Sequence, residues 1–139
     1  QTDKGEAEVK TLAQEYLASG KAQADFGSGA RVGEIHPIHR ADGDLHSWVV
    51  EVKQADSFVG AAVLRSGKTT FESAVFPRKQ PDFWSPDRRQ AEERFRVQHP
   101  GATGVKSEII LRQTGYTWSV RGKVDGRETV LLIHTAYCG

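Results

Sequence analysis

The sequence predicts an α+β fold in which two amphipathic helices pack on antiparallel β-meander sheet. Its 139 residues, 37% hydrophobic and 27% charged, are typical of one globular domain. Two segments carry apolar residues at helical spacing, and most of the rest alternates between polar and apolar residues around turn sequences. The order is helix, four strands, helix, three strands, a candidate αββββ-αβββ internal repeat. We therefore expect a single domain, 1–139, with a first half at about 1–77, a connector at 78–85 and a second half at about 86–139.

The first element is an amphipathic helix, expected over residues 3–19. Asp3, three residues before Glu6, approximates a capping box, and Gly20 is placed to end the helix. Residues 21–30 are expected to form a loop after it. The apolar residues recur at the spacing of one helical face, which we expect to pack on a sheet: Val9, Leu12, Ala13, Tyr16 and Leu17.

Four alternating runs follow, at 31–40, 45–54, 57–65 and 69–76. Asp42-Gly43 separates the first two runs, and Asp-Gly at such a position is a strong hairpin signal because both residues tolerate a positive φ. Ser66-Gly67-Lys68 separates the last two runs in the same way. The runs predict an antiparallel meander whose inner face is covered by the first helix.

The connector leads into a second helix. Ser85-Pro86-Asp87 places a capping serine before a proline at the first helical position, and His99-Pro100-Gly101 ends the helix after about Gln98. Its apolar stripe is thin, so we expect it to be half exposed. Three more alternating runs complete the chain at 105–112, 116–124 and 128–137, with Asp125-Gly126 between the last two. Each half therefore carries one Asp-Gly hairpin, and the halves share one sheet or form two sheets back to back.

The first hairpin is expected to have one apolar core face and one mixed, exposed face. A two-residue turn at Asp42-Gly43 places Glu34 opposite Glu51 on the mixed face, beside His36 and Lys53. Like charges directly opposite each other destabilise a hairpin unless a cation lies between them. Lys53 as a diagonal partner on a solvated face accounts for this pair, and a bound metal ion is the alternative.

The same register places His39 directly opposite His46 at the open end of the hairpin. Two imidazoles on directly opposed strand residues can chelate a transition metal, or repel each other once protonated. Two ordinary surface histidines beside a turn are the other interpretation. We treat the pair as a candidate metal site.

No catalytic constellation is evident, which favours a non-enzymatic protein without a cofactor. The single cysteine, Cys138, excludes an intramolecular disulfide and any multi-cysteine metal site. Glu51-Val52-Lys53 resembles the acid-x-lysine motif of metal-dependent nucleases, in which two carboxylates hold Mg²⁺ and the lysine acts on the attacking water. With Glu34 or Asp44 as the second carboxylate, a metal-dependent nuclease or hydrolase is the alternative hypothesis.

The charge distribution argues against a nucleic-acid partner. The 19 basic and 18 acidic residues leave a net charge of only +1. Arginine and aromatic residues alternate between Arg78 and Arg96, as they do on single-strand-binding surfaces, but acidic residues interrupt them, as on a solvated helix face. No apolar run approaches the ~18 residues of a membrane span.

The first half, from Tyr16-Leu17 to about Pro77, resembles PepSY-like and streptopain-prodomain-like propeptide modules. The matching features are the helix, the turn sequence at 39–44, the aromatic-bearing strand at 47–52 and the glycine-marked strand at 58–64. Ser73 to Pro77 takes the position of the strand that follows in such modules. The resemblance implies a secreted or periplasmic module that inhibits or chaperones a peptidase, or that senses at the cell envelope. The second αβ half departs from that pattern.

We therefore expect a non-enzymatic exported module that recognises a protein partner, either a peptidase or a cell-envelope protein. Gln1 in place of a methionine is consistent with a removed targeting segment and a secreted or cell-envelope location. A structural subunit of an extracellular assembly, joined through Cys138, is a further hypothesis. Partner contact is expected on the mixed hairpin face or at the connector aromatics, which gives the candidate residues Glu34, His36, Glu51, Lys53, Phe83 and Trp84.

Overall fold

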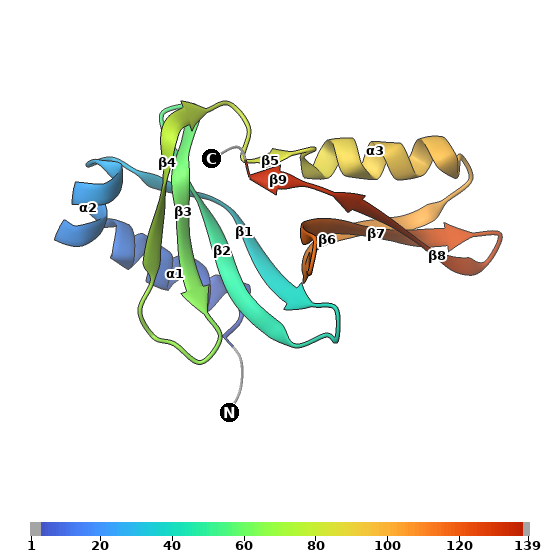
Figure 1. Ribbon diagram of the computed structural model, residues 1–139, viewed down its shortest axis with the longest axis horizontal. Helices are drawn as coiled ribbons and strands as arrows, with labels where there is room; N and C mark the ends of the chain where they lie inside the picture. Colours follow the sequence, from blue (N-terminus) through green and yellow to red (C-terminus); the bar gives the residue numbers. More distant parts are fainter. Residues whose placement is uncertain (1–3, 138–139) are drawn as a thin grey trace.

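The predicted α+β class is confirmed. The computed structural model describes residues 4–137, which form three helices and one seven-stranded sheet (Figure 1). Within this part of the chain, no helix is long and apolar enough to cross a membrane. The helices are α1 (Glu6–Leu17), α2 (Gly20–Phe26) and α3 (Arg88–Gln98). The strands of the large sheet are β1 (Arg31–Arg40), β2 (Leu45–Gln54), β3 (Ser57–Arg65), β4 (Glu72–Gln80), β6 (Thr103–Arg112), β7 (Gly115–Val124) and β8 (Arg127–His134).

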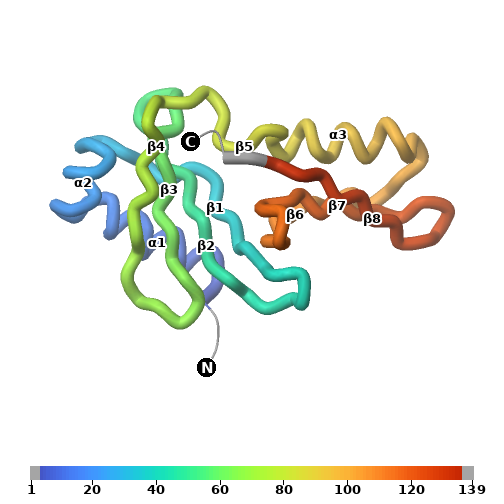
Figure 2. The backbone as a smooth tube through the Cα atoms, in the orientation of Figure 1, coloured from blue at the N-terminus to red at the C-terminus, as the bar shows by residue number. Residues whose placement is uncertain are grey.

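A single sheet joins the two halves. Its strand order is β4-β3-β2-β1-β6-β7-β8, so each half is an antiparallel meander and the first strands of the halves lie side by side. That contact, β1 with β6, is the parallel one and pairs His39 with Ile110. A separate two-stranded sheet pairs β5 (Trp84–Ser85) with β9 (Ala136–Tyr137). The trace in Figure 2 follows the chain from the first meander through the connector into the second.

The two Asp-Gly turns occupy different places in the two meanders. Asp42-Gly43 lies between β1 and β2, the first hairpin of its half, whereas Asp125-Gly126 lies between β7 and β8, the second hairpin of its half. Ala55, between β2 and β3, has the same left-handed φ as Asp125, at 52° and 53°. Each half therefore carries one Asp-Gly hairpin, but the two occupy different places in the strand order, and Ala55-Asp56 lies between the second and third strands as Asp125-Gly126 does.

The predicted helix at 3–19 is divided, and part of the loop expected after it is helical. α1 ends at Leu17, and Ser19 then caps α2, its hydroxyl accepting a hydrogen bond from the Ala22 amide at 3.3 Å. Gly20 therefore opens a second helix instead of ending the first. At the other end of α1 the N-cap is Gly5, which makes no side-chain capping bond.

The connector is shorter than expected because β4 continues to Gln80. Pro77 lies inside this strand, between Val75 and Gln80, where the pairing with β3 is irregular, and an edge strand tolerates proline at such a bulge. The N-cap of α3 is Asp87 and not Ser85: its carboxylate accepts from the Gln90 amide at 2.8 Å, and the Gln90 side chain accepts from the Asp87 amide at 3.0 Å. Together these bonds form a capping box.

Two hydrophobic cores lie on opposite faces of the sheet. α1 and α2 cover one face of β1–β4, where Val50 and Val52 belong to the core. α3 and the connector cover the other face, where Val49 belongs to the same cluster as Phe95 and Trp118. Val49 and Val50 are neighbours and both fully buried, so β2 is covered on both faces. In Figure 1 the blue helices lie beside the first meander and the yellow helix α3 lies along the second.

The predicted hairpin register is confirmed in the centre of the hairpin, where Ile35 pairs with Val50 and Ile38 pairs with Ser47. It is wrong at the open end, where His39 pairs with Leu45 instead of His46. The Arg40 amide donates to the Asp44 carbonyl at 2.8 Å, so three residues, 41–43, form the loop. Gly43, at φ +97°, takes the left-handed position that a three-residue loop requires, and the register shifts by one.

Candidate functional site

The mixed face of the first hairpin is buried, not exposed. His36 on β1 and Glu51 on β2 retain 1% and 5% of their accessible surface. The connector folds over them, and Phe83 and Trp84 are buried there in an aromatic cluster with rings 5.0 Å apart. The expected exposure of these four residues is therefore wrong. Strand periodicity shows that a face is mixed, but it does not show which distant segment returns to cover it.

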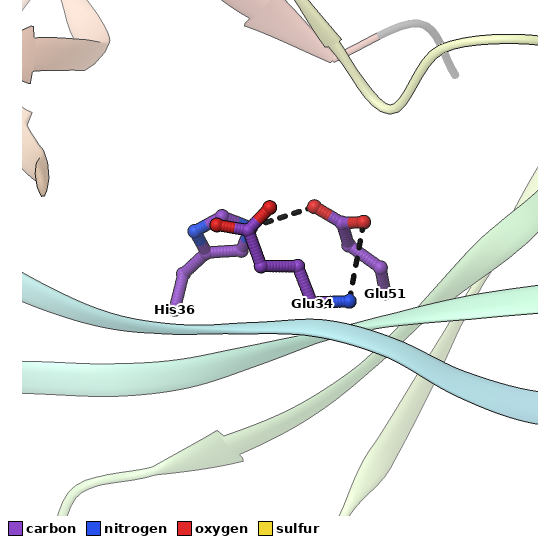
Figure 3. Close-up of side chains that lie close together, drawn as sticks. All are labelled: Glu34, His36 and Glu51. Carbon is purple, nitrogen blue, oxygen red and sulfur yellow. Dashed lines mark hydrogen bonds and ion pairs between the residues drawn. The ribbon is translucent and has the colours of Figure 1, made fainter. Parts of the chain in front are cut away.

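His36 and Glu51 form a tight buried pair (Figure 3). His36 Nε2 lies 2.6 Å from Glu51 Oε2, a distance at which a proton lies between the two atoms, on the imidazole or on the carboxyl group. The Trp84 indole N–H is directed at the same Nε2 at 3.1 Å, and Arg88 Nη2 lies 3.5 Å from Nδ1. Indole, guanidinium and carboxyl groups from three other segments thus converge on one imidazole.

Glu34 lies beside Glu51, as the sequence predicted, at a bulge in β1. The register shifts between Val32 and Ile35, and the Glu34 amide donates to Glu51 Oε1 at 3.4 Å. A Cβ on Gly33 would lie 3.1 Å from Glu51 Cβ, so glycine at this position leaves room for the carboxylate. The two acids have different partners: Glu34 pairs with the Arg88 guanidinium, and Glu51 pairs with the His36 imidazole.

Lys53 does not form the diagonal pair that the sequence predicted. Its Nζ lies 5.0 Å from the centre of the Phe58 ring, as in a cation–π contact. The lysine of the acid-x-lysine motif therefore lies against the Phe58 ring on the neighbouring strand, β3.

Arg88, at the start of α3, links both halves of the protein. Its Nε and Nη2 donate to Glu34 Oε1 on β1 at 2.7 and 2.6 Å. Its Nη1 donates to the carbonyl and the hydroxyl of Ser107 on β6, at 2.6 and 3.0 Å. The guanidinium also lies 5.0 Å from the Trp118 ring on β7. No local signal marked Arg88 for these contacts, because neighbouring arginines and acids give α3 the pattern of a solvated helix.

The cluster opens into a pocket of about 440 Å³ beneath the first turns of α3. Glu34 and Glu51 line it directly, together with aromatic residues of the connector. The charged lining residues comprise five acids and three arginines: Glu34, Glu51, Asp82, Asp87, Glu92, Arg88, Arg89 and Arg96. The lining therefore favours a cationic occupant over an anionic one.

The candidate metal pair His39 and His46 lacks the directly opposed geometry expected of it, because of the shifted register. His46 Nδ1 instead lies 3.0 Å from Ser47 Oγ. Partial burial, together with the charges of Arg40 and Arg65, lowers the pKa of His46. Among the described residues, the three metal-ligating side chains that do come together are Glu34, His36 and Glu51, whose ligand atoms lie within 4.8 Å of one another.

A second surface, absent from the sequence-based expectations, lies on β6–β8 opposite α3. The described helices pack elsewhere: α1 on β1 and β2, α2 on β4, and α3 on the other face of β6 and β7. The surface is hollowed by about 670 Å³. We call it the open face and define it by Lys106, Glu108, Arg121, Lys123, Glu128, Val130 and Leu132. The alternation of Val130 and Leu132 with Leu131 and Ile133 was a signal for a strand with apolar residues on both faces.

Gln1 and Cys138, on which the processing and assembly hypotheses depended, lie outside the described residues. No protein family model matches the chain, and neither the curated proteins nor the solved structures contain a significant match. The resemblance to PepSY-like modules remains a prediction from the sequence.

Proposed function

We propose that this chain is a non-enzymatic recognition module that binds an extended segment of a protein partner along β8. The observation that supports it is an edge strand with large apolar residues exposed. Val130 and Leu132 keep 53% and 44% of their surface accessible. Exposed apolar side chains beside an open sheet edge are typical of a protein-interaction site.

The edge position of β8 favours binding by strand addition. β8 is the last strand of the sheet, so the outward backbone N–H and C=O groups of Arg127–His134 are not paired within the large sheet. An extended segment can pair with such an edge through main-chain hydrogen bonds, while alternate side chains supply specificity. Val130 and Leu132 are two residues apart and so share one face of the strand.

The charges of the open face favour an acidic segment. Three basic residues there, Lys106, Arg121 and Lys123, outnumber the acids Glu108 and Glu128. Arg121 is 3.5 Å from Glu108, whereas Lys106 and Lys123 form no ion pair within residues 4–137. A partner segment with alternating apolar residues and at least one carboxylate would complement both the apolar and the basic parts of this surface.

The class of partner follows from the resemblance described above. We propose an exported protein that contacts a peptidase or a cell-envelope protein, with the two meanders as repeated αβ units and the second one carrying the recognition surface. The proposed partner contact therefore lies on the open face, and not on the hairpin face or at the connector aromatics, which are buried.

The test uses a phage-displayed library of random linear peptides, followed by synthetic peptides of the enriched sequences. We expect enriched peptides to alternate apolar residues and to contain Asp or Glu, and to slow hydrogen exchange in β8. The double substitution Val130→Glu and Leu132→Glu should weaken binding at least about tenfold, equivalent to ~1.4 kcal/mol. Val75→Glu is the matched control, since Val75 is 51% exposed on the opposite edge strand, β4. Undiminished binding by the double variant, or protection elsewhere than β8, would refute the proposal.

A metal-dependent hydrolase is the second candidate, supported by the approach of Glu34 to Glu51. In such enzymes two carboxylates hold the ion and a lysine acts on the attacking water. The position of Lys53 over the Phe58 ring disfavours that role. The assay is Mn²⁺-dependent hydrolysis of bis(p-nitrophenyl) phosphate and of single-stranded DNA. Turnover that is lost in both Glu34→Gln and Lys53→Met would support a hydrolase, and the absence of metal-dependent turnover would remove it.

A further inference from the structure

We propose that Glu34, His36 and Glu51 form a binding site for one divalent transition-metal ion, with Zn²⁺ as the best match. The ion would tie β1 to β2 directly beneath the start of α3 and so stabilise the junction between the two halves. The inference is independent of recognition along β8, and it requires no hydrolytic step.

The three side chains offer ligand atoms close to coordinating distance from a common point. These atoms lie within 4.8 Å of one another, and they come from two adjacent strands, so the backbone already holds them together. Zinc–ligand distances of about 2.1 Å correspond to tetrahedral ligand separations of about 3.4 Å. Rotation of Glu34, whose side chain is half exposed, shortens the distances from its carboxylate to the other two ligand atoms.

Metal binding replaces a proton that is already shared. The proton between His36 Nε2 and Glu51 Oε2 leaves to solvent, and the lone pairs of both atoms are donated to the ion. No oxidation or reduction is involved. The two atoms, 2.6 Å apart, must separate by somewhat less than 1 Å to accommodate the ion, as estimated from the tetrahedral spacing.

The surroundings supply the contacts that metal ligands commonly have. Arg88 hydrogen-bonds Glu34 Oε1, which leaves Oε2 as the ligand atom; within residues 4–137, Oε2 has no hydrogen-bond partner. Carboxylates that bind metals are often held by a hydrogen bond on the other oxygen. Here that bond also keeps Glu34 beside Glu51, because the Arg88 charge offsets the repulsion between the two acids.

The pocket provides both access and attraction for a cation. Glu34 and Glu51 line the same pocket of about 440 Å³. Its five acids outnumber its three arginines, so the field at the mouth favours a positive ion. The imidazole nitrogen then selects among ions, because Mg²⁺ and Ca²⁺ prefer oxygen ligands only, whereas Zn²⁺ takes one nitrogen with carboxylate oxygens readily.

The experiment measures Zn²⁺ binding to the full chain by isothermal titration calorimetry in two buffers of different ionisation enthalpy, with Mg²⁺ as the comparison ion. We expect one Zn²⁺ per chain, a released proton, a raised melting temperature and no Mg²⁺ binding. Glu34→Gln should weaken Zn²⁺ binding at least about tenfold while the protein still folds, because Glu34 is half exposed. Glu108→Gln is the matched control, since Glu108 is a similarly exposed, ion-paired acid on β6.

Two further variants separate the proposal from its competitors. His36→Gln should also lose Zn²⁺ binding; if it does not fold, Glu34→Gln decides the question alone. The double variant His39→Gln and His46→Gln should bind Zn²⁺ as the wild type does. The proposal is overturned if the wild type binds no Zn²⁺ stoichiometrically, if Glu34→Gln binds as tightly as the wild type, or if binding is lost in the His39/His46 variant.

Discussion

Substitution of Arg88 by methionine tests whether this residue holds the two halves together. Methionine keeps much of the apolar stem but removes the guanidinium and its bonds to Glu34 and Ser107. The charged hydrogen bonds to Ser107 contribute ~1.5–3 kcal/mol. The ion pair with Glu34 adds only ~0.2–1 kcal/mol, since both side chains are partly exposed and screened by solvent. The contact with the Trp118 ring adds ~0.5–1 kcal/mol.

We therefore expect Arg88→Met to lower the free energy of unfolding by about 3 kcal/mol. For a chain of this length, this corresponds to a fall in melting temperature of about 10 °C. Urea denaturation and calorimetry measure the two quantities. Arg88→Lys keeps the charge near Glu34 but cannot reach Glu34 and Ser107 together, so its loss should be intermediate.

A double-mutant cycle with Glu34→Gln separates the ion pair from the rest. The coupling energy between Glu34 and Arg88 should not exceed ~1 kcal/mol, which assigns most of the loss to Ser107 and Trp118. A variant Arg88→Met within ~0.5 kcal/mol of the wild type would refute the reasoning. A coupling energy above ~2 kcal/mol would show that the ion pair dominates, contrary to its exposure.

Two further predictions concern the first half. Gly60→Ala should lower the free energy of unfolding, measured in urea, by about 3 kcal/mol, because the new Cβ would overlap the Ala74 carbonyl oxygen on β4. Gly101→Ala is the control and should be nearly neutral, because its Cβ would meet no atom within 4 Å; equal effects of the two substitutions would contradict the packing argument. Burial and nearby arginines lower the pKa of His46, so His46 binds a proton more readily in the unfolded chain than in the folded one. The contribution of neutral His46 to the free energy of unfolding is therefore fully present above about pH 6.5, and it is lost as the pH falls toward the lowered pKa. His46→Gln should therefore reduce the difference in stability between about pH 7.5 and about pH 5.5, and His39→Gln is the control whose equal effect would argue against His46 as the source.

Local patterns were sufficient to predict most strands and the second helix. β1, β2 and β3 lie at the predicted residues, because turn residues and alternation act over a few positions. The division between α1 and α2 was not predicted, since Ser19 and Gly20 fit the end of one helix as well as the start of another. Propensity alone does not choose between these two, and the packing of Phe26 in the core supports the second helix.

The burial of the site depended on contacts between residues far apart in the sequence. One local signal was present: Trp48–Val52 is a nearly continuous apolar run, which is typical of a strand covered on both faces. Glu51 interrupts that run, and its burial required a partner that periodicity could not identify. Trp84 and Arg88, which approach His36 from 48 and 52 residues away, complete the cluster only once the connector folds over β1.

The open face is a consequence of how the two meanders join. β1 and β6 lie side by side in parallel, and α1 and α3 pack on opposite faces of the sheet that these strands join. Each helix then leaves the other face of its own meander uncovered. In the first half that face is closed by Phe83, Trp84 and their neighbours from the connector. Within residues 4–137 no such segment follows β8 onto the open face, so Val130 and Leu132 stay exposed. Because uncovered apolar side chains favour binding of a partner, the strand topology itself accounts for the location that we propose for partner contact.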